Sequence, residues 1–142
     1  MTGEHMRGLD ELFGAEEPHA SFHDASMLEL RLDYRARTAP ALFELYVGDS
    51  AAADATARER TRIGILELTG LIFWVQEPPT LDGRAGLPWL TGDGPLRDTE
   101  TEIGQDLARQ VPPEAWAWCL YFSDWNACAY CAAMGVTFRW VK

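Results

Sequence analysis

The sequence is poor in basic residues and has no long hydrophobic run. Twelve lysines and arginines stand against 22 aspartates and glutamates, and the net charge is −10. A chain of this charge repels a phosphate backbone, so we expect no nucleic-acid partner. No apolar stretch is long enough to cross a bilayer, and residues 1–12 lack the apolar core of a signal peptide. The sequence therefore predicts no membrane partner and a cytoplasmic location.

Cysteine and histidine are scarce, with three of each. An odd number of cysteines in a reducing compartment argues against a disulfide framework. Cys128 and Cys131 have the spacing of a redox motif, but residues three apart in a strand point to opposite faces, so we expect buried, inert thiols. His19, His23 and Asp24 have the residue types of a metal site, without a helix or a further cluster to complete one. The prediction is no metal and no cofactor.

The sequence also lacks the local patterns of common catalytic sites. No serine stands in the Gly-x-Ser-x-Gly pattern of a nucleophile elbow, and no glycine spacing matches a phosphate-binding loop. His23 and Asp24 are neighbours in what is expected to be a strand, where their side chains would point apart. These features leave catalysis undecided and favour a protein that is not an enzyme.

Alternating apolar and polar residues indicate a β-rich fold. In an expected strand over 26–35, Leu28, Leu30, Leu32 and Tyr34 fall on one face, which we expect to be the dry one. Thr69-Gly70 is expected to bend the chain between two strands. The other strands are expected at 41–47, 58–68, 71–76, 116–122, 127–133 and 136–141.

The remaining segments predict short helices and loops. Residues 9–13 suit one helical turn, and residues 98–110 suit a helix capped by Thr99 or Thr101. Residues 51–57 are expected to be a hairpin loop, and 77–99, with four prolines and four glycines, a long loop. The expected class is α+β: a mainly antiparallel sheet, built as a sandwich or a partly open barrel, with one or two short helices. We expect one domain over 1–142, with 1–20 as a loosely packed N-terminal segment.

Two short motifs carry a resemblance to known proteins. Phe22-His23-Asp24-Ala25 before the alternating strand, with Ser123-Asp124-Trp125-Asn126 near the C-terminus, resembles small uncharacterised bacterial proteins. Some of these look like immunity proteins of polymorphic toxin systems. The resemblance implies a cytoplasmic, β-rich, single-domain bacterial protein that neutralises a toxin by covering it, and it brings no catalytic residues with it.

The leading hypothesis is a non-enzymatic acidic binding protein, immunity-like, that engages a basic protein partner. Its negative charge would steer such a partner toward it. Trp89 is the expected anchor of the interface. The residues expected to bind the partner are Asp82, Trp89, Asp93, Asp98, Glu100, Glu102 and Asp106.

Two alternatives come from other functional classes. The first is a small-molecule binder or hydrolase with a pocket at the sheet mouth, formed by His23, Asp24, Trp125 and Asn126. Trp125, at the tip of a turn, is expected to be tucked under the loop. The second is a structural or oligomerisation module in which an exposed edge strand, Phe138-Arg139-Trp140, pairs two chains as a homodimer.

Overall fold

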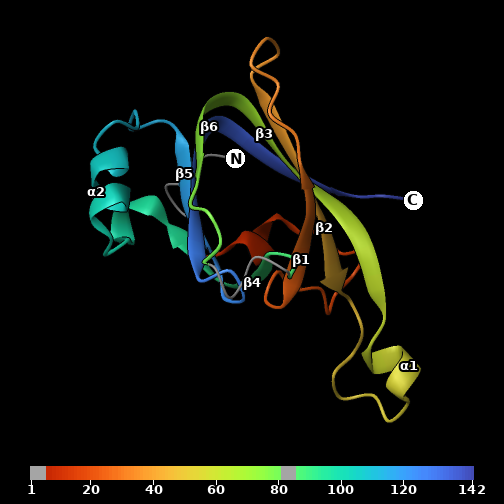
Figure 1. The fold of residues 1–142 in the computed structure, drawn as a ribbon. Helices are drawn as coiled ribbons and strands as arrows, with labels where there is room; N and C mark the ends of the chain where they lie inside the picture. The colour runs from red at the N-terminus through yellow and green to blue at the C-terminus, as the bar shows by residue number, and fades with distance from the viewer. Residues whose placement is uncertain (1–5, 81–85) are drawn as a thin grey trace.

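Six antiparallel strands close into a barrel in the computed structural model, which describes residues 6–80 and 86–142 (Figure 1). Around the barrel the order is β1-β2-β3-β6-β5-β4. The mainly antiparallel class and the barrel are confirmed, and the sandwich alternative is not what forms. The strands are β1 (Ala25–Leu30), β2 (Thr38–Tyr46), β3 (Thr61–Gln76), β4 (Trp89–Pro95), β5 (Trp116–Phe122) and β6 (Ala127–Trp140).

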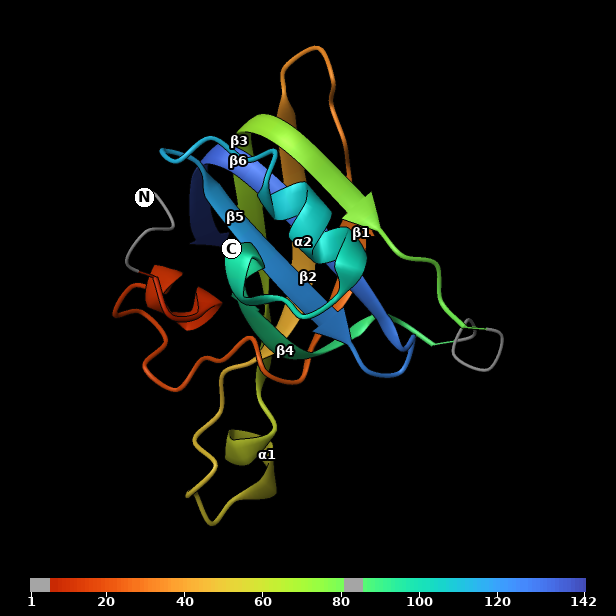
Figure 2. The same cartoon turned by 90° about the vertical axis from the view of Figure 1, so that its left-hand side faces the viewer.

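The helical segments are short and lie outside the sheet or at its end. They are η1 (Leu9–Leu12), α1 (Ala55–Arg58), η2 (Leu96–Asp98) and α2 (Glu102–Ala108). Thr101 caps α2, its hydroxyl accepting a hydrogen bond from the Gly104 N–H at 3.1 Å, so the expected cap is right and the expected helix 98–110 is too long. α1 lies in the segment expected to be a plain loop. Figure 2 shows α2 across the outside of β5 and α1 at the end of an extended hairpin.

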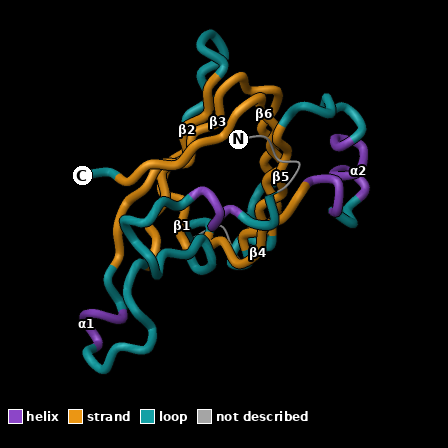
Figure 3. Tube along the Cα trace, turned by 180° about the vertical axis from the view of Figure 1, so that it is seen from behind, coloured by secondary structure: helices purple, strands orange, loops and turns teal. Residues whose placement is uncertain are grey.

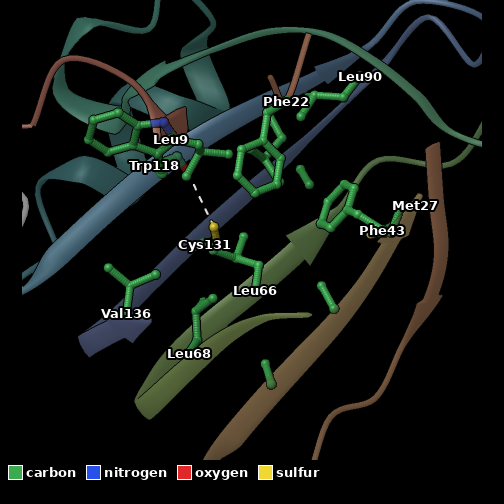
Figure 4. Close-up of a cluster of buried hydrophobic side chains, with 14 of the residues drawn as sticks. Leu9, Phe22, Met27, Phe43, Leu66, Leu68, Leu90, Trp118, Cys131 and Val136 are labelled. Atoms are coloured by element: carbon green, nitrogen blue, oxygen red, sulfur yellow. Dashed lines mark hydrogen bonds between the residues drawn. The ribbon is translucent and has the colours of Figure 1, made fainter. Parts of the chain in front are cut away.

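The barrel interior is filled by side chains from alternate strand positions. On β2, Ala39, Ala41, Phe43 and Leu45 are fully buried, while Tyr46 is exposed. β5 contributes Trp116, Trp118, Leu120 and Phe122 in the same two-residue rhythm. Figure 4 shows part of this core, with Phe22, Phe43 and Trp118 among the side chains that meet inside the barrel.

β3 and β6 are long strands that bend together rather than pairs of shorter strands. The expected break at Thr69-Gly70 is a bend within β3, where Gly70 has a φ of +59° and the register with β6 shifts between Leu71 and Phe73. A glycine adopts this left-handed conformation without steric cost, so the strand turns the barrel corner there. Likewise, the two strands expected at 127–133 and 136–141 are one, β6.

β1 differs most from its expected pattern. A bulge at Leu28 shifts the register with β2 between Met27 and Glu29. An extra residue in a strand reverses which side chains face inward, so Met27 is buried and Leu28 is 38% exposed. β1 also ends at Leu30, and Tyr34 lies in the following hairpin at 79% exposure. The expectation that Leu28 and Tyr34 face the core was therefore wrong.

The long loop expected at 77–99 is also wrong in part, because it contains β4. Gly92, Gly94 and Pro95 make this strand hard to predict from the sequence, since glycine and proline are poor strand formers. β4 pairs with β5 over most of its length and with β1 through Ala25–Leu90 and Ser26–Trp89, which closes the barrel.

The N-terminal segment closes one end of the barrel. Leu9 is fully buried, and the Phe13 ring stacks on Phe22 with 5.0 Å between centroids. Figure 3 shows η1 close to β1 and β4. Glu17 is only 6% exposed, and its carboxylate accepts hydrogen bonds from Arg60 at 2.7 Å and from Arg62 at 2.8 Å. These contacts hold the segment that leads into Phe22-His23-Asp24 against the start of β3.

Candidate binding surface

An open hollow of about 450 Å³ lies where the N-terminal segment meets the start of β1 and the end of β2. We call it the histidine hollow. It brings together His19 and His23, which are 53% and 65% exposed, with the Asp24 carboxylate. The hollow is lined by His19, Ser21, His23, Asp24, Tyr46, Gly48, Ser50 and Arg58.

His23 and Asp24 face one another despite being neighbours in the chain. His23 Nδ1 lies 3.1 Å from Asp24 Oδ2. The expected divergence of these side chains assumed that both stand in a strand, but β1 begins only at Ala25, and Asp24 has a φ of +72°. In that left-handed conformation, which aspartate tolerates better than most residues, the carboxylate swings back toward the imidazole.

The Ser21 hydroxyl is already engaged within this segment. It donates a hydrogen bond to Asp10 Oδ2 at 3.2 Å and accepts one from the His23 N–H at 3.0 Å. Asp10 also accepts the Phe22 N–H at 2.8 Å. These bonds fix the backbone before Asp24, and they occupy the Ser21 hydroxyl.

A second hollow of about 330 Å³ adjoins the first and shares two of its residues. It is lined by Asp24, Ser26, Tyr46 and Trp89, and we call it the aromatic groove. Trp89 and Tyr46 are 43% and 47% exposed. Sequence reasoning missed Tyr46, although the alternation of Phe43 and Leu45 inward already places Tyr46 on the outer face of β2.

The Trp89 backbone is held firmly while its ring is half exposed. The Trp89 N–H donates to Asp124 Oδ1 at 2.8 Å, and its carbonyl accepts the Ser123 N–H at 3.0 Å. The turn Ser123-Asp124-Trp125-Asn126, singled out by the sequence, therefore serves to position Trp89.

Trp125 and Asn126 line neither hollow. Trp125 is half-buried against the core, and its indole N–H donates to the Gly86 carbonyl at 2.7 Å. Asn126 Oδ1 accepts the Tyr121 hydroxyl at 2.9 Å. Of the four residues expected to form one pocket, the structure brings together only His23 and Asp24.

Four of the six acids expected to accompany Trp89 lie beyond the other end of β4. They belong to residues 96–115, the connection from β4 to β5, which we call the helical cap. A seven-residue strand spans about 20 Å, so Trp89 and these acids form two separate surfaces. Asp98 and Asp106 are each paired with a nearby arginine, Arg97 and Arg109 respectively. Glu100 and Glu102 are exposed.

Two acids of the expected set stand apart from the cap. Asp93 Oδ2 accepts hydrogen bonds from Trp118 Nε1 at 2.8 Å and from the Leu9 N–H at 3.0 Å, so this carboxylate joins η1 to the barrel. Asp82 lies outside the described residues.

A hollow of about 240 Å³ lies at the helical cap. Its walls come from η2, from the end of α2, from the segment that follows α2 and from β5; they include Leu96, Val111, Pro112 and Pro113, together with Arg97. Ile103 on α2 is 42% exposed. The cap thus combines a hollow walled mainly by apolar residue types with exposed charged residues, and a polar rim of this kind is found around protein interfaces.

The three cysteines behave as the strand geometry predicts. Cys131 is fully buried in the core, whereas Cys128 lies on the outer face, so the two sulfurs diverge. Cys119 pairs with Tyr130 across β5 and β6, and burial raises the pKa of the Cys119 thiol to about 12. Burial raises the pKa of the Cys128 thiol as well. All three are free thiols and stay protonated at neutral pH.

Within residues 6–80 and 86–142, no three histidine, cysteine, aspartate or glutamate side chains come close enough to hold a metal ion. None of the helices described there has the length and apolar character that crossing a bilayer requires. Phe138 and Trp140, expected at an exposed edge, turn inward onto Phe13, with centroids 4.9 and 5.5 Å from it.

Compared with known protein families, with curated proteins and with solved structures, the chain matches none of them. The likeness to immunity proteins stays a prediction from two short motifs.

Proposed function

We propose that this is a non-enzymatic acidic binding protein that engages a basic protein partner, in the manner of an immunity protein that covers a toxin. The observation that carries the proposal is the helical cap. Its residues, 96–115, hold five carboxylates against two arginines, and they include the exposed Ile103 and most of the lining of the hollow of about 240 Å³. The carboxylates would steer a basic partner, and the leucine, valine and proline side chains of the hollow would supply contact area once it arrives.

The fold suits this role because it presents the cap on a rigid base. The Thr101 hydroxyl, which caps α2, also lies 2.9 Å from the fully buried Tyr130 hydroxyl on β6. Gly104 lets α2 lie close to the preceding segment at Thr99, since a Cβ at this position would lie 2.2 Å from Thr99 Cγ2. A cap fixed in advance loses little conformational entropy when a partner binds.

The test compares two triple variants that remove the same charge from different places. Asp98→Asn, Glu100→Gln and Glu102→Gln change the cap, while Glu16→Gln, Glu29→Gln and Glu59→Gln change exposed acids elsewhere. A partner isolated from native cell extract at low salt is purified, and its association rate is measured by stopped flow. We expect the rate to fall at least about tenfold between low and high salt, and the cap variant to be slower than its matched control.

Either of two results contradicts the proposal. An association rate that does not change with ionic strength removes electrostatic steering. Equal rates for the two triple variants mean that only the overall charge matters and that the cap is not the docking surface.

A second candidate, a small-molecule binder or hydrolase, is favoured by the His23–Asp24 contact at 3.1 Å in the histidine hollow. It ranks below the first because the Ser21 hydroxyl is occupied and both imidazoles are more than half exposed. A small metabolite that shifts the NMR signals of both imidazoles at low concentration would reverse this order.

A further inference from the structure

The aromatic groove has the composition of a site for a cationic group. Two half-exposed aromatic rings, Tyr46 and Trp89, line a hollow of about 330 Å³ together with the Asp24 carboxylate and the Ser26 hydroxyl. Aromatic faces attract cations, and a carboxylate beside them supplies the opposite charge. We propose that this groove binds an arginine side chain of the basic partner, which stacks on the rings while its guanidinium meets Asp24.

Strand register places these residues side by side. Trp89 pairs with Ser26 on β1, and Ser26 pairs with Glu44 on β2, so the three lie in one row across the sheet. Tyr46 stands two residues beyond Glu44 on the same outer face of β2. Asp24 precedes β1, and its carboxylate lies 3.1 Å from His23 Nδ1, yet Asp24 lines the same hollow as Tyr46 and Trp89. A planar cation in this hollow would meet both rings and the carboxylate.

The groove is built on rigid backbone. Trp89 is held through its N–H by Asp124 and through its carbonyl by Ser123. Asp24 is fixed by its N–H, which donates to the Leu90 carbonyl at 2.8 Å, and it keeps a left-handed φ of +72°. Its side chain is 43% exposed, so the carboxylate is accessible to a ligand.

The charges around the groove favour a cation. Glu44 is exposed in the same row, and Asp49 is 47% exposed near His19. Arg58, which lines the adjoining histidine hollow, donates from Nη1 to two backbone carbonyls, those of Ala52 and Ala53. His23 is the main internal competitor, since its Nδ1 lies 3.1 Å from the Asp24 carboxylate.

Arginine suits this groove better than lysine. Its guanidinium is planar, weakly hydrated and able to stack on a ring while it donates two parallel hydrogen bonds to a carboxylate. A lysine ammonium is compact and strongly hydrated, so it gains less from two flat rings.

The test is an NMR titration of the full chain, which follows the indole N–H signal of Trp89. The probes are a blocked arginine and a blocked citrulline, which has nearly the same shape without the charge, with a blocked lysine as a third probe. We expect saturable shifts with arginine in the millimolar range and weaker binding of lysine and citrulline. The comparison of probes uses wild-type protein and needs no variant to fold.

Three single variants locate the binding. Asp24→Asn keeps a side chain that tolerates the left-handed backbone and removes the charge, and we expect it to weaken arginine binding about two- to fivefold. Trp89→Leu, followed through the amide signals of Ser26 and Tyr46, should weaken it by a similar factor. Tyr34→Leu is the matched control, because Tyr34 is 79% exposed in the hairpin after β1 and lines neither hollow of the site.

Equal binding of arginine and citrulline overturns the proposal, as does an effect of Asp24→Asn no larger than that of Tyr34→Leu. Tighter binding of tetramethylammonium than of arginine also overturns it and assigns the groove to a quaternary ammonium ligand.

The idea that the arginine belongs to a protein rests on the proposed function, but the two proposals can fail separately. If arginine does not bind while the cap variant still slows the partner, the groove is wrong and the proposed function stands. If arginine binds and the cap variant associates as fast as its matched control, the groove proposal stands and the proposed role of the cap is wrong.

Discussion

Protonation of Glu17 should destabilise the protein at low pH, because this carboxylate is the centre of a small ionic network. Hydrogen bonds from Arg60 and Arg62 lower the pKa of Glu17 from 4.5 to about 2. A group with a lowered pKa in the folded state stabilises that state above its unfolded pKa and loses this contribution as the pH falls. The stabilisation by Glu17 should therefore be complete above about pH 5 and lost progressively from pH 4.5 toward pH 2.

The size of the effect follows from the shift and from solvent exposure. At about 1.4 kcal/mol for each pKa unit, the shift of Glu17 from 4.5 to about 2 sets an upper limit of about 3 kcal/mol. The Arg60 side chain is 52% exposed, so water screens part of the interaction. We expect Glu17→Gln to lower the free energy of unfolding at pH 7 by about 1–2 kcal/mol.

The assay is urea unfolding of wild type and Glu17→Gln at pH 7, 5, 4 and 3. The difference between the two proteins isolates Glu17 from the other 21 acids, which titrate in both. Glu16→Gln is the control, since Glu16 is 63% exposed and pairs with Arg62 at 3.2 Å, so its effect should stay below about 0.5 kcal/mol. A wild-type-minus-Glu17→Gln difference that is the same at pH 7 and pH 3 refutes the reasoning.

Two further predictions concern the barrel itself. Asp93→Ala should lower the free energy of unfolding by about 2–3 kcal/mol, because the buried Trp118 indole N–H loses its acceptor, whereas Asp98→Ala should change it by less than about 0.5 kcal/mol in the same urea assay. Gly70→Ala should cost about 1–2 kcal/mol, since the φ of +59° is unfavourable for alanine and its Cβ would lie 2.9 Å from a neighbouring side chain. Gly94→Ala, with open space around the position, is the control in thermal unfolding. If a variant and its control lose the same stability, the structural explanation given for that variant is wrong.

Regular alternation made β2 and β5 predictable from the sequence. In β2, each inward position is apolar, and the expected 41–47 overlaps the observed Thr38–Tyr46. β5 was expected over 116–122 and runs from Trp116 to Phe122. In both strands every local preference agrees with the barrel, so the pattern alone was sufficient.

The failures occur where one residue changes the backbone in a way that the pattern does not reveal. The bulge at Leu28 reverses the faces of β1, and the left-handed Asp24 turns its side chain toward His23. β4 is hidden by glycine and proline, and its pairing with β1 depends on contacts 63 residues apart in sequence, as in Ser26–Trp89. These are the elements that build the aromatic groove. Two of the four residues that line the groove were predicted to be functional, but at different sites: Asp24 in a pocket with His23, and Trp89 as the anchor of a protein interface.

The filled barrel explains why binding is expected on the outside of this protein. Barrels of about eight strands have an interior just wide enough for side chains, and this one has six. Two tryptophans stacked with 5.6 Å between centroids, and three buried phenylalanines, occupy its interior. Tyr46 and Trp89 are half exposed because each occupies an outward-facing position next to a buried residue of its strand, Leu45 on β2 and Leu90 on β4. Tyr46 and Trp89 each keep nearly half of their surface in water, so folding gains only part of the free energy that full burial of the rings would give. Contact with a partner would bury the rest, and a single neutral substitution in the groove, Asp24→Asn, should therefore weaken binding with little effect on stability.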